Sequence, residues 1–389
     1  MTRQRSSVAV LGATGSIGTQ TLEVIRREPE RFTIVALSGG SRLRELSAMA
    51  GEFGVKHVGV RTEEDRETLR SMVSKDTEIV VGSEGLELLA QSADIVVNAV
   101  VGFAGLPVTL SALKAGKRLA LANKESFIAA APLVASVRST PGAELVPIDS
   151  EHCAIHQCLA SSPGLPGYPD VRRLHITASG GPFRGFSKAQ LQAVTKEQAL
   201  RHPTWSMGAK ITIDSSTLMN KGLEVLEASG LFGIEVDRIN VVVHPQSIVH
   251  SMVEYVDGSV LAQLSAPDMR LPIAYCLGLP ERLDHAWGAL DFTTRHQLTF
   301  EAPDREAFGA LDLAYEAARL GGGAPATLSA ANEVAVEAFL DDRISWSQIT
   351  PLVASVLETY KDITLTSVDD VLEVDRAARE RAHDTLRVQ

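Results

Sequence analysis

The sequence predicts an α/β protein with three parts: an N-terminal doubly wound, Rossmann-like domain, a central α+β domain and a C-terminal helical bundle. Up to about residue 149, short apolar strands alternate with amphipathic helical stretches, as in a doubly wound parallel sheet. Beyond residue 150 the pattern changes, and strands appear with a hairpin signal at Asp257-Gly258. From about residue 306 onward the pattern is helical throughout.

The strands of the first domain read as buried, because each is a short apolar run. We expect them at Val8–Leu11, Phe32–Leu37, His57–Val60, Glu78–Val81, Ile95–Asn98, Arg118–Leu121 and Glu144–Ile148. The segments after residues 98 and 121 lie at the edge of the sheet where strands give way to loops. Ligands bind at that edge in this class of fold.

A glycine-rich turn follows the first strand. Gly12, Gly15 and Gly18 let the backbone approach a phosphate, and the helix that begins there offers free N–H groups. The place of this turn between a strand and a helix predicts a dinucleotide site, although a purely structural turn has the same spacing.

The end of the second strand indicates which dinucleotide binds. An NAD site usually has Asp or Glu there for the ribose 2′-hydroxyl, whereas this chain has Ser38-Gly39-Gly40-Ser41-Arg42. Small residues and one arginine suit a 2′-phosphate, so we expect NADP(H). The alternative is a surface turn with a solvated arginine.

The central region begins with strands that we expect at Arg173–Ala178, Asn240–His244, Ser247–Val256 and Ser259–Leu264. Between the first two lies segment 179–208, which is rich in Gly, Pro and polar residues and is long for a connection. Long structured loops of this kind often act as lids, so we expect one here.

The composition narrows the classes of function. The formal net charge is −11, which argues against nucleic-acid and anionic-membrane surfaces, although local basic residues can still bind a phosphorylated substrate. The three cysteines, Cys153, Cys158 and Cys276, favour reduced thiols in a cytosol. No apolar run reaches the length of a membrane span, and the six residues before the first strand are too few for a targeting peptide. We therefore expect a cytoplasmic protein.

Two carboxylates at the end of a strand form the first candidate site. Asp149 and Glu151 flank Ser150 and are two residues apart, so both can point to one side and hold a divalent cation. The alternative is a helix N-terminus, where acidic residues are favoured by the dipole.

A second cluster spans residues 214–224, which we read as a strand end at Asp214, a capping cluster and a helix. Asn220 and Glu224 share a helix face, with Lys221 beside them. Together with the hydroxyls before them they form a plausible phosphate cradle, and Glu224 a possible third metal ligand. An ordinary cap with a surface Asn-Lys pair is the alternative.

The expected lid carries a third candidate, in which Trp205 and Met207 would form an apolar cover and His202 would hydrogen-bond a substrate. The tryptophan could instead dock on a core. At the ligand edge of the first sheet, Lys124 could meet substrate or form a surface ion pair.

Histidines are ambiguous from sequence alone. His152 and His156 are one helical turn apart, which fits helix packing better than zinc because the usual ligand spacings are absent. His244 and His250 could be structural or line the site.

Taken together, these segments closely resemble the 1-deoxy-D-xylulose 5-phosphate reductoisomerase family over nearly the whole chain. The matching segments are Gly12–Gly18, Ala122–Ser126, Pro147–His152, Thr177–Phe183, Arg201–Gly208, Asp214–Glu224, His244–Met252, Pro267–Arg270 and Ala330–Val336. The resemblance implies conversion of 1-deoxy-D-xylulose 5-phosphate to 2-C-methyl-D-erythritol 4-phosphate, by rearrangement of the carbon skeleton and reduction with NADPH. It also implies a divalent cation (magnesium, manganese or cobalt) and a homodimer, with the Ser247–Leu264 hairpin as the expected contact.

The same resemblance implies a role for each matching residue. The metal ligands would be Asp149, Glu151 and Glu224, which with Lys124 and His202 are the expected catalytic residues. The phosphosugar substrate would meet Lys124, Ser150, Glu151, Ser179, His202, Trp205, Ser215, Asn220, Lys221 and Glu224. The cofactor would meet Thr14, Gly15, Ser16, Ile17, Gly40, Ser41, Arg42, Asn123, Glu125 and Gly208. One departure is Arg42, because relatives often carry Asn there.

These assignments divide the chain into an NADPH-binding domain (1–149), a catalytic domain (150–290) with its lid (179–208), a linker (291–305) and a helical domain (306–389). Two other functions compete with this interpretation. A simple NADP-dependent dehydrogenase of the homoserine or semialdehyde type would need no three-carboxylate metal site. An NADP-sensing regulator would have no reason to keep those carboxylates together with Lys221.

Overall fold

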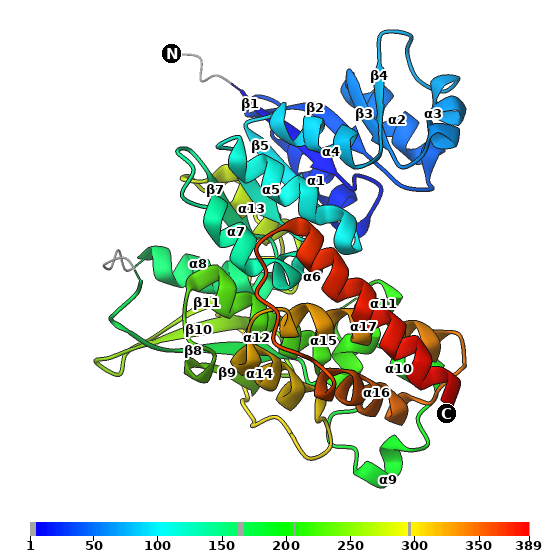
Figure 1. Ribbon diagram of the computed structural model, residues 1–389. Helices are drawn as coiled ribbons and strands as arrows, with labels where there is room; N and C mark the ends of the chain where they lie inside the picture. The colour runs from blue at the N-terminus through cyan, green and yellow to red at the C-terminus, as the bar shows by residue number, and fades with distance from the viewer. Residues whose placement is uncertain (1–4, 162–166, 206, 295–296, 389) are drawn as a thin grey trace. The chain divides into compact units, whose positions relative to one another are not determined.

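A parallel sheet forms the centre of the first of two compact units (Figure 1). The computed structural model describes residues 5–161, 167–205, 207–294 and 297–388. The strand order is β4-β3-β2-β1-β5-β6-β7, and every neighbouring pair is parallel. The strands are β1 (Ser6–Leu11), β2 (Phe32–Ser38), β3 (His57–Val60), β4 (Glu78–Val81), β5 (Ile95–Asn98), β6 (Arg118–Leu121) and β7 (Glu144–Pro147). This confirms the predicted doubly wound sheet.

The strand order reverses between β1 and β5, which are neighbours although three strands separate them along the chain. Such a switch point leaves a crevice at the carboxyl ends of the strands, where ligands bind. The helices that lie wholly or in part in this unit are α1 (Ser16–Arg27), α2 (Leu43–Phe53), α3 (Glu63–Arg70), α4 (Gly82–Gln91), η1 (Gly102–Gly105), α5 (Leu106–Lys114), α6 (Lys124–Ala129), α7 (Ala131–Val137), α8 (Ser150–Ser161) and α13 (Arg270–Gly278).

Helix α13 joins the first unit from far along the chain. The units are residues 1–127, 134–153 and 268–287, and residues 128–133, 154–267 and 288–389, whereas the sequence-based division leaves 268–287 in the central domain. The packing explains the difference, because α13 contacts α1, β6 and β7 and buries Ile273 and Cys276 completely. The Cys276 thiol lies 3.3 Å from the carbonyl of Pro147.

A cluster of charged and aromatic side chains fixes this segment to α1. The guanidinium groups of Arg27 and Arg270 lie 4.3 and 4.6 Å from the centre of the Trp287 ring, within cation–π range. Arg270 also donates to Glu23 at 2.6 Å, although 247 residues separate the two in sequence.

A mixed four-stranded sheet with the order β11-β10-β8-β9 lies in the second unit. Its strands are β8 (Val171–Ala178), β9 (Ile239–Val243), β10 (Val249–Tyr255) and β11 (Val260–Leu264). β8 and β9 are parallel, while β10 pairs antiparallel with both β8 and β11. The predicted hairpin is therefore present, and Gly258 takes the positive φ that its turn needs.

Helices build the rest of the second unit. They are α9 (Lys188–Leu191), α10 (Lys196–Ala199), α11 (Ala209–Thr217), α12 (Met219–Phe232), η2 (Val236–Arg238), α14 (Ala310–Leu320), α15 (Ala324–Leu340), α16 (Trp346–Glu358) and α17 (Val368–Val388). α12 packs on β8 and β9, and α15 packs on both α16 and α17. The predicted C-terminal bundle is thus confirmed, with a core of Leu328, Val353 and Ala382 among others.

One sequence-based assignment is wrong. Asp214, expected at the end of a strand, lies inside α11 together with Ser215. The β-branched Ile211-Thr212-Ile213 run imitates a strand, but Gly208 starts a helix there and Ile213 is buried in the helical core. Ser206 of the expected lid and residues 295–296 of the expected linker lie outside the described residues.

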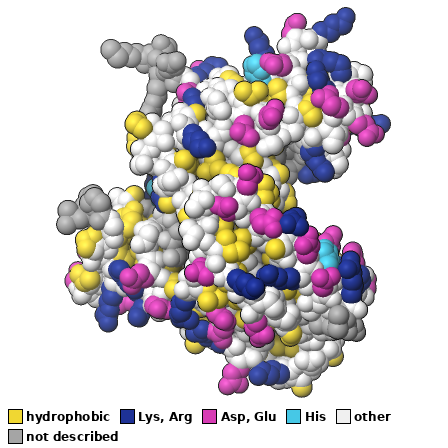
Figure 2. Space-filling view, viewed as in Figure 1, with side chains coloured by type: hydrophobic (Ala, Val, Ile, Leu, Met, Phe, Trp, Pro, Cys, Tyr) yellow, Lys and Arg dark blue, Asp and Glu magenta, His cyan; other side chains and the backbone are white. Residues whose placement is uncertain are grey.

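Within the described ranges, no helix combines the length and the apolar character needed to cross a bilayer. Figure 2 shows acidic and basic side chains interspersed over the visible face rather than gathered into one basic patch.

Candidate functional site

The glycine-rich turn between β1 and α1 lies against the loop that follows β5. Gly12 has a φ of +93°, and a Cβ there would lie 2.2 Å from the carbonyl oxygen of Ala99. Only glycine fits so close an approach. Gly15 caps α1 without a side-chain hydrogen bond, which leaves the helix N-terminus able to bind an anion.

A pocket of about 600 Å³ opens at this turn, entirely within the first unit. Of the predicted cofactor residues, Thr14, Gly15, Gly40, Ser41 and Arg42 line it. Ser16 and Ile17 begin α1 immediately beyond the lining. The volume and the open helix N-terminus fit a dinucleotide phosphate.

The remaining predicted cofactor residues lie elsewhere. Asn123 is buried and donates from its amide nitrogen to the carbonyls of Val100 and Gly102, at 2.7 and 2.8 Å, so it holds the loop after β5. Glu125 lies in the first turn of α6, and Gly208 caps α11 in the second unit.

Two arginines line the pocket, and only one of them was found from the sequence. Arg42 donates to Glu45 at 3.2 Å and also to the carbonyl of Thr14. Arg61 lies at the end of β3 and lines the same pocket. The only signal in the sequence is a cation directly after a buried strand, whereas Arg42 lies four residues beyond the end of β2.

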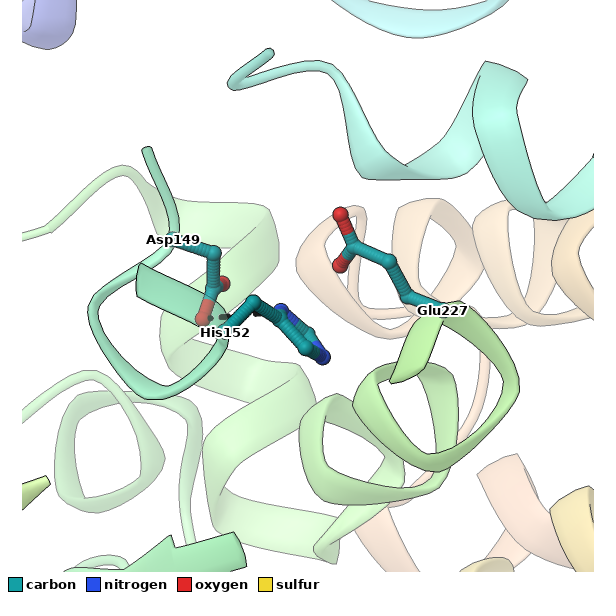
Figure 3. A group of neighbouring side chains, drawn as sticks. All are labelled: Asp149, His152 and Glu227. Carbon is teal, nitrogen blue, oxygen red and sulfur yellow. Dashed lines mark ion pairs between the residues drawn. The ribbon is translucent and has the colours of Figure 1, made fainter. Parts of the chain in front are cut away.

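Asp149 and Glu151 follow β7, but Glu151 lies in the first turn of α8, so the helix N-terminus considered as the alternative is present. Lys124 donates to Asp149 at 2.6 Å, so the ion pair considered as an alternative exists and is mostly buried. Ser150 donates to Glu151 at 2.5 Å. His152 also contacts Asp149, at 3.3 Å, as Figure 3 shows. This end of the first unit therefore offers two carboxylates, the donor type that hard divalent cations prefer.

The second unit places a lysine, an amide and a carboxylate on one face of α12. Glu224 is almost completely buried and accepts from Lys221 at 2.7 Å and from Asn220 at 2.5 Å. Its neighbour one turn on, Glu227, is also buried and is drawn in Figure 3. Burying an unpaired carboxylate costs free energy, so Lys221 and Asn220 stabilise the charge of Glu224 on this helix face.

Ser179 and Ser215 meet through a close approach of two backbone segments. Gly181 has a φ of +67°, and a Cβ there would lie 2.6 Å from the carbonyl oxygen of Ser215. Any larger residue at this position would push apart the segment after β8 and α11. The two serines predicted to bind phosphate are therefore held near each other within one unit.

The ring of His202 has a defined tautomer. Its Nδ1 accepts from the backbone N–H groups of Thr204 and Trp205, at 3.1 and 2.9 Å, so the proton of the neutral ring is on Nε2. Nε2 lies 3.1 Å from the hydroxyl of Ser179 and donates to it. Burial, and then the charge of Lys221, lower the pKa of His202 to about 4, so the ring is neutral at pH 7.

This arrangement orients the Ser179 hydroxyl. Its oxygen accepts from His202 and from the backbone N–H of Gly181, at 3.1 and 3.2 Å. Both acceptor positions are filled, so the hydroxyl proton is left to donate to a bound anion.

The aromatic part of the expected lid is half-buried. The Trp205 ring lies 6.3 Å from the ring of His250, within the second unit. His244 is structural, because its Nδ1 donates to the carbonyl of Thr299 at 2.9 Å and its Nε2 accepts from the backbone of Ile248 at 3.2 Å.

Two helices of the C-terminal bundle, α15 and α16, form hydrogen bonds with buried side chains of α11. The indole N–H of Trp346 donates to Ser216 at 2.8 Å, and the amide of Asn332 donates to Asp214 at 2.8 Å. All four side chains are buried. Directly after these contacts, Leu218 takes a φ of +62° between α11 and α12. The residues expected to bind phosphate lie on both sides of this turn.

Comparison with protein families matches most of the chain. Residues 8–131 match the family described as 1-deoxy-D-xylulose 5-phosphate reductoisomerase. Residues 145–232 and 264–381 match two C-terminal domains described for the same enzyme.

Individual relatives agree with the family match. The 1-deoxy-D-xylulose 5-phosphate reductoisomerase of Chlorobaculum tepidum is 49% identical over 383 residues, covering 98% of this chain and 99% of the relative. The Zymomonas mobilis enzyme, solved in complex with NADPH, has a TM-score of 0.92 and 43% identity, covering 98% of this chain and 99% of that one. A further reductoisomerase, solved with NADPH, fosmidomycin and magnesium, has a TM-score of 0.91 and 42% identity, with 98% of both chains covered.

We expect His202 to titrate near pH 4 rather than near its ordinary value of 6.5. Because the unfolded state then binds more protons between these two values, His202 lowers the stability as the pH falls from 6.5 to 4 and has no such effect above 6.5. NMR titration of the ring gives the pKa directly. Urea unfolding of the wild type and His202→Gln at both ends of this window gives the stability difference, and a ring that titrates near 6.5 would contradict the expectation.

Trp346→Phe should lower the free energy of unfolding by about 2 kcal/mol, because the smaller ring loses the N–H donor to Ser216 and part of the packing against Phe183 and Phe308. Urea denaturation measures the effect. Ser216→Ala removes the same hydrogen bond, so the double variant should be less destabilised than the sum of the two single variants. Strict additivity would show that this bond contributes nothing.

Proposed function

The chain belongs to the 1-deoxy-D-xylulose 5-phosphate reductoisomerase family. We propose that Asp149, Glu151 and Glu224 hold the metal and that α11 and α12 hold the substrate phosphate. The chain converts 1-deoxy-D-xylulose 5-phosphate to 2-C-methyl-D-erythritol 4-phosphate with NADPH and a divalent metal. The observation that carries this conclusion is the match of family and fold over nearly the full length of the chain. Neither a simple dehydrogenase nor a regulator accounts for that match.

Asp149, Glu151 and Glu224 are the metal ligands in this proposal. The fit rests on their chemistry: each offers carboxylate oxygens, and the buried Glu224 has its charge balanced by Lys221. When bound, a divalent cation supplies Lewis-acid polarisation of the substrate oxygens.

The chain's own side chains bind and orient the substrate. Lys124, held by Asp149 at 2.6 Å, presents an ammonium group toward substrate oxygens, and Ser150 offers a hydroxyl beside it. His202, neutral at pH 7, donates through Nε2 to Ser179 and so orients that hydroxyl toward the substrate. These groups orient the reacting carbons.

The phosphate of the substrate is gripped by Ser179, Ser215, Asn220 and Lys221. The Ser179 proton is directed outward by its two donors, and Lys221 supplies the positive charge. Because the phosphate does not react, its binding energy serves to position the distant reacting centre. Trp205 and Met207 would close over this site and exclude water.

NADPH binds the pocket of the first unit in this proposal. Its pyrophosphate lies at Thr14, Gly15, Ser16 and Ile17, at the N-terminus of α1. The adenosine end lies at the segment 40–42, while Asn123, Glu125 and Gly208 contact the cofactor elsewhere.

The hairpin of β10 and β11 is our candidate for the contact between two copies of the chain. β11 is an edge strand, and Val256, Val260 and Leu261 on this hairpin are exposed. An exposed apolar edge strand pairs readily with a second strand. We further place the enzyme in the cytoplasm, which the sparse thiols Cys153, Cys158 and Cys276 favour, all three free and buried.

Glu224→Gln should abolish turnover and leave NADPH binding intact, because the carboxylate is lost while the dinucleotide pocket is in the other unit. The assay follows NADPH absorbance with 1-deoxy-D-xylulose 5-phosphate and manganese, and wild-type turnover should also vanish with EDTA. Glu337→Gln, an exposed position on α15, is the matched control and should retain activity. Activity of Glu224→Gln at the wild-type level, or turnover that persists in EDTA, removes this metal assignment.

Leu261→Asp should convert a dimer into a monomer, since it places a charge on the exposed edge of β11. Light scattering coupled to gel filtration measures the mass. Leu372→Asp changes an equally apolar exposed residue on α17 and should leave the dimer intact. A wild-type monomer, or a Leu261→Asp variant that remains dimeric, would place the contact elsewhere or exclude it.

A further inference from the structure

Arg61 stands at the end of β3, where the register of the sheet brings it beside the end of β2. Ser38 pairs with Gly59, and the N–H of Gly39 donates to the carbonyl of Gly59 at 3.1 Å. Two residues further along each strand are Gly40 and Arg61. The two residues lie close together, because an ideal Cβ built on Gly40 would be 3.7 Å from Cδ of Arg61.

The two arginines of the pocket differ in what they already bind. Arg42 is occupied, with one nitrogen on Glu45 and another on the backbone of Thr14. Arg61 is exposed and forms no ion pair or side-chain hydrogen bond with the part of the chain that the structure describes. Its five N–H donors are therefore available to a ligand without breaking an existing bond.

We propose that Arg61 recognises the 2′-phosphate of the dinucleotide and so determines the preference for NADPH over NADH. The position is suitable, because the end of β2 is where this class of fold meets the ribose of the adenosine. A guanidinium group can bind a phosphate through two parallel hydrogen bonds, which an ammonium group cannot. This inference rests on NADPH being the cofactor under the proposed function.

Arg42 has a supporting role in this arrangement. Its bond to the carbonyl of Thr14 ties the β2 loop to the glycine-rich turn, and its pair with Glu45 offsets part of its positive charge. The free positive charge at the adenosine end of the pocket is therefore that of Arg61. The interpretation from sequence alone placed Arg42 in this role.

Binding of the two dinucleotides to the metal-free and substrate-free protein tests the proposal. The readout is the dissociation constant of NADPH and of NADH, measured by isothermal titration calorimetry. Arg61→Gln should weaken NADPH binding by about 10- to 100-fold, as expected for the loss of hydrogen bonds between charged groups, and leave NADH binding unchanged. Arg61→Lys keeps the charge but not the planar guanidinium group. Its NADPH dissociation constant should lie between those of the wild type and Arg61→Gln.

Arg66→Gln is the matched control, because it removes the same charge from an exposed arginine on α3, where Arg66 pairs with Glu63 at 3.2 Å. It should leave both dissociation constants unchanged. The salt dependence adds a second readout, since NADPH binding should depend less steeply on ionic strength in Arg61→Gln than in the wild type.

Three results would overturn the proposal. Equal weakening of NADPH and NADH would place Arg61 against the adenine ring. An unchanged NADPH affinity in Arg61→Gln, with a loss in Arg42→Gln, would return the 2′-phosphate to Arg42. An equal loss of NADPH affinity in Arg66→Gln would show that the effect comes from the net charge of the protein and not from a contact with Arg61. A wild-type protein that binds neither dinucleotide would instead contradict the proposed function itself.

Discussion

The left-handed turn at Leu218 fixes the geometry of the residues assigned to the substrate phosphate, and much of the second unit holds it in place. Ser215 precedes this turn on α11, while Asn220 and Lys221 follow it on α12. A non-glycine residue in this conformation costs about 1–2 kcal/mol and persists only where its surroundings impose it. Here the surroundings are two buried hydrogen bonds, from Trp346 and Asn332, which prevent α11 from relaxing. The C-terminal bundle therefore contributes to the site without contacting a ligand.

The positive charges expected to meet the substrate are set by local ion pairs, although the chain as a whole is negatively charged. The chain carries a formal net charge of −11, yet the residues expected to meet an anionic substrate include buried or half-buried lysines. Each of these lysines has a carboxylate partner in its own unit: Lys124 pairs with Asp149, and Lys221 with Glu224. Such pairs offset the desolvation of both members and keep the ammonium groups in one position. Because each carboxylate is also an assigned metal ligand, a bound cation would share it with the ammonium group of its lysine.

The sequence predicted the sheets well and some of their surroundings poorly, for physical reasons. Buried parallel strands such as Val8–Leu11 are recognisable because apolar residues occupy both faces. The helix around Asp214 was mistaken for a strand because its β-branched residues favour strands locally, whereas tertiary packing decided the outcome. Arg61 was missed because its role depends on the register between β3 and β2, which a linear pattern does not contain. The placement of α13 depends on contacts such as that between Arg270 and Glu23, far apart in sequence.

Because α13 comes late in the sequence, the first unit cannot be completed early in synthesis. Ribosomes release a protein from its N-terminus, and domains generally fold as units during synthesis. The dinucleotide-binding unit, however, is complete only when residues 268–287 have emerged, after about half of the other unit has already been produced. Until then, the surface of α1, β6 and β7 that α13 covers stays uncovered, because α13 with its buried Ile273 and Cys276 has not yet been made. A nascent chain that ends before residue 268 therefore lacks one of the helices that bury the core of its dinucleotide-binding unit.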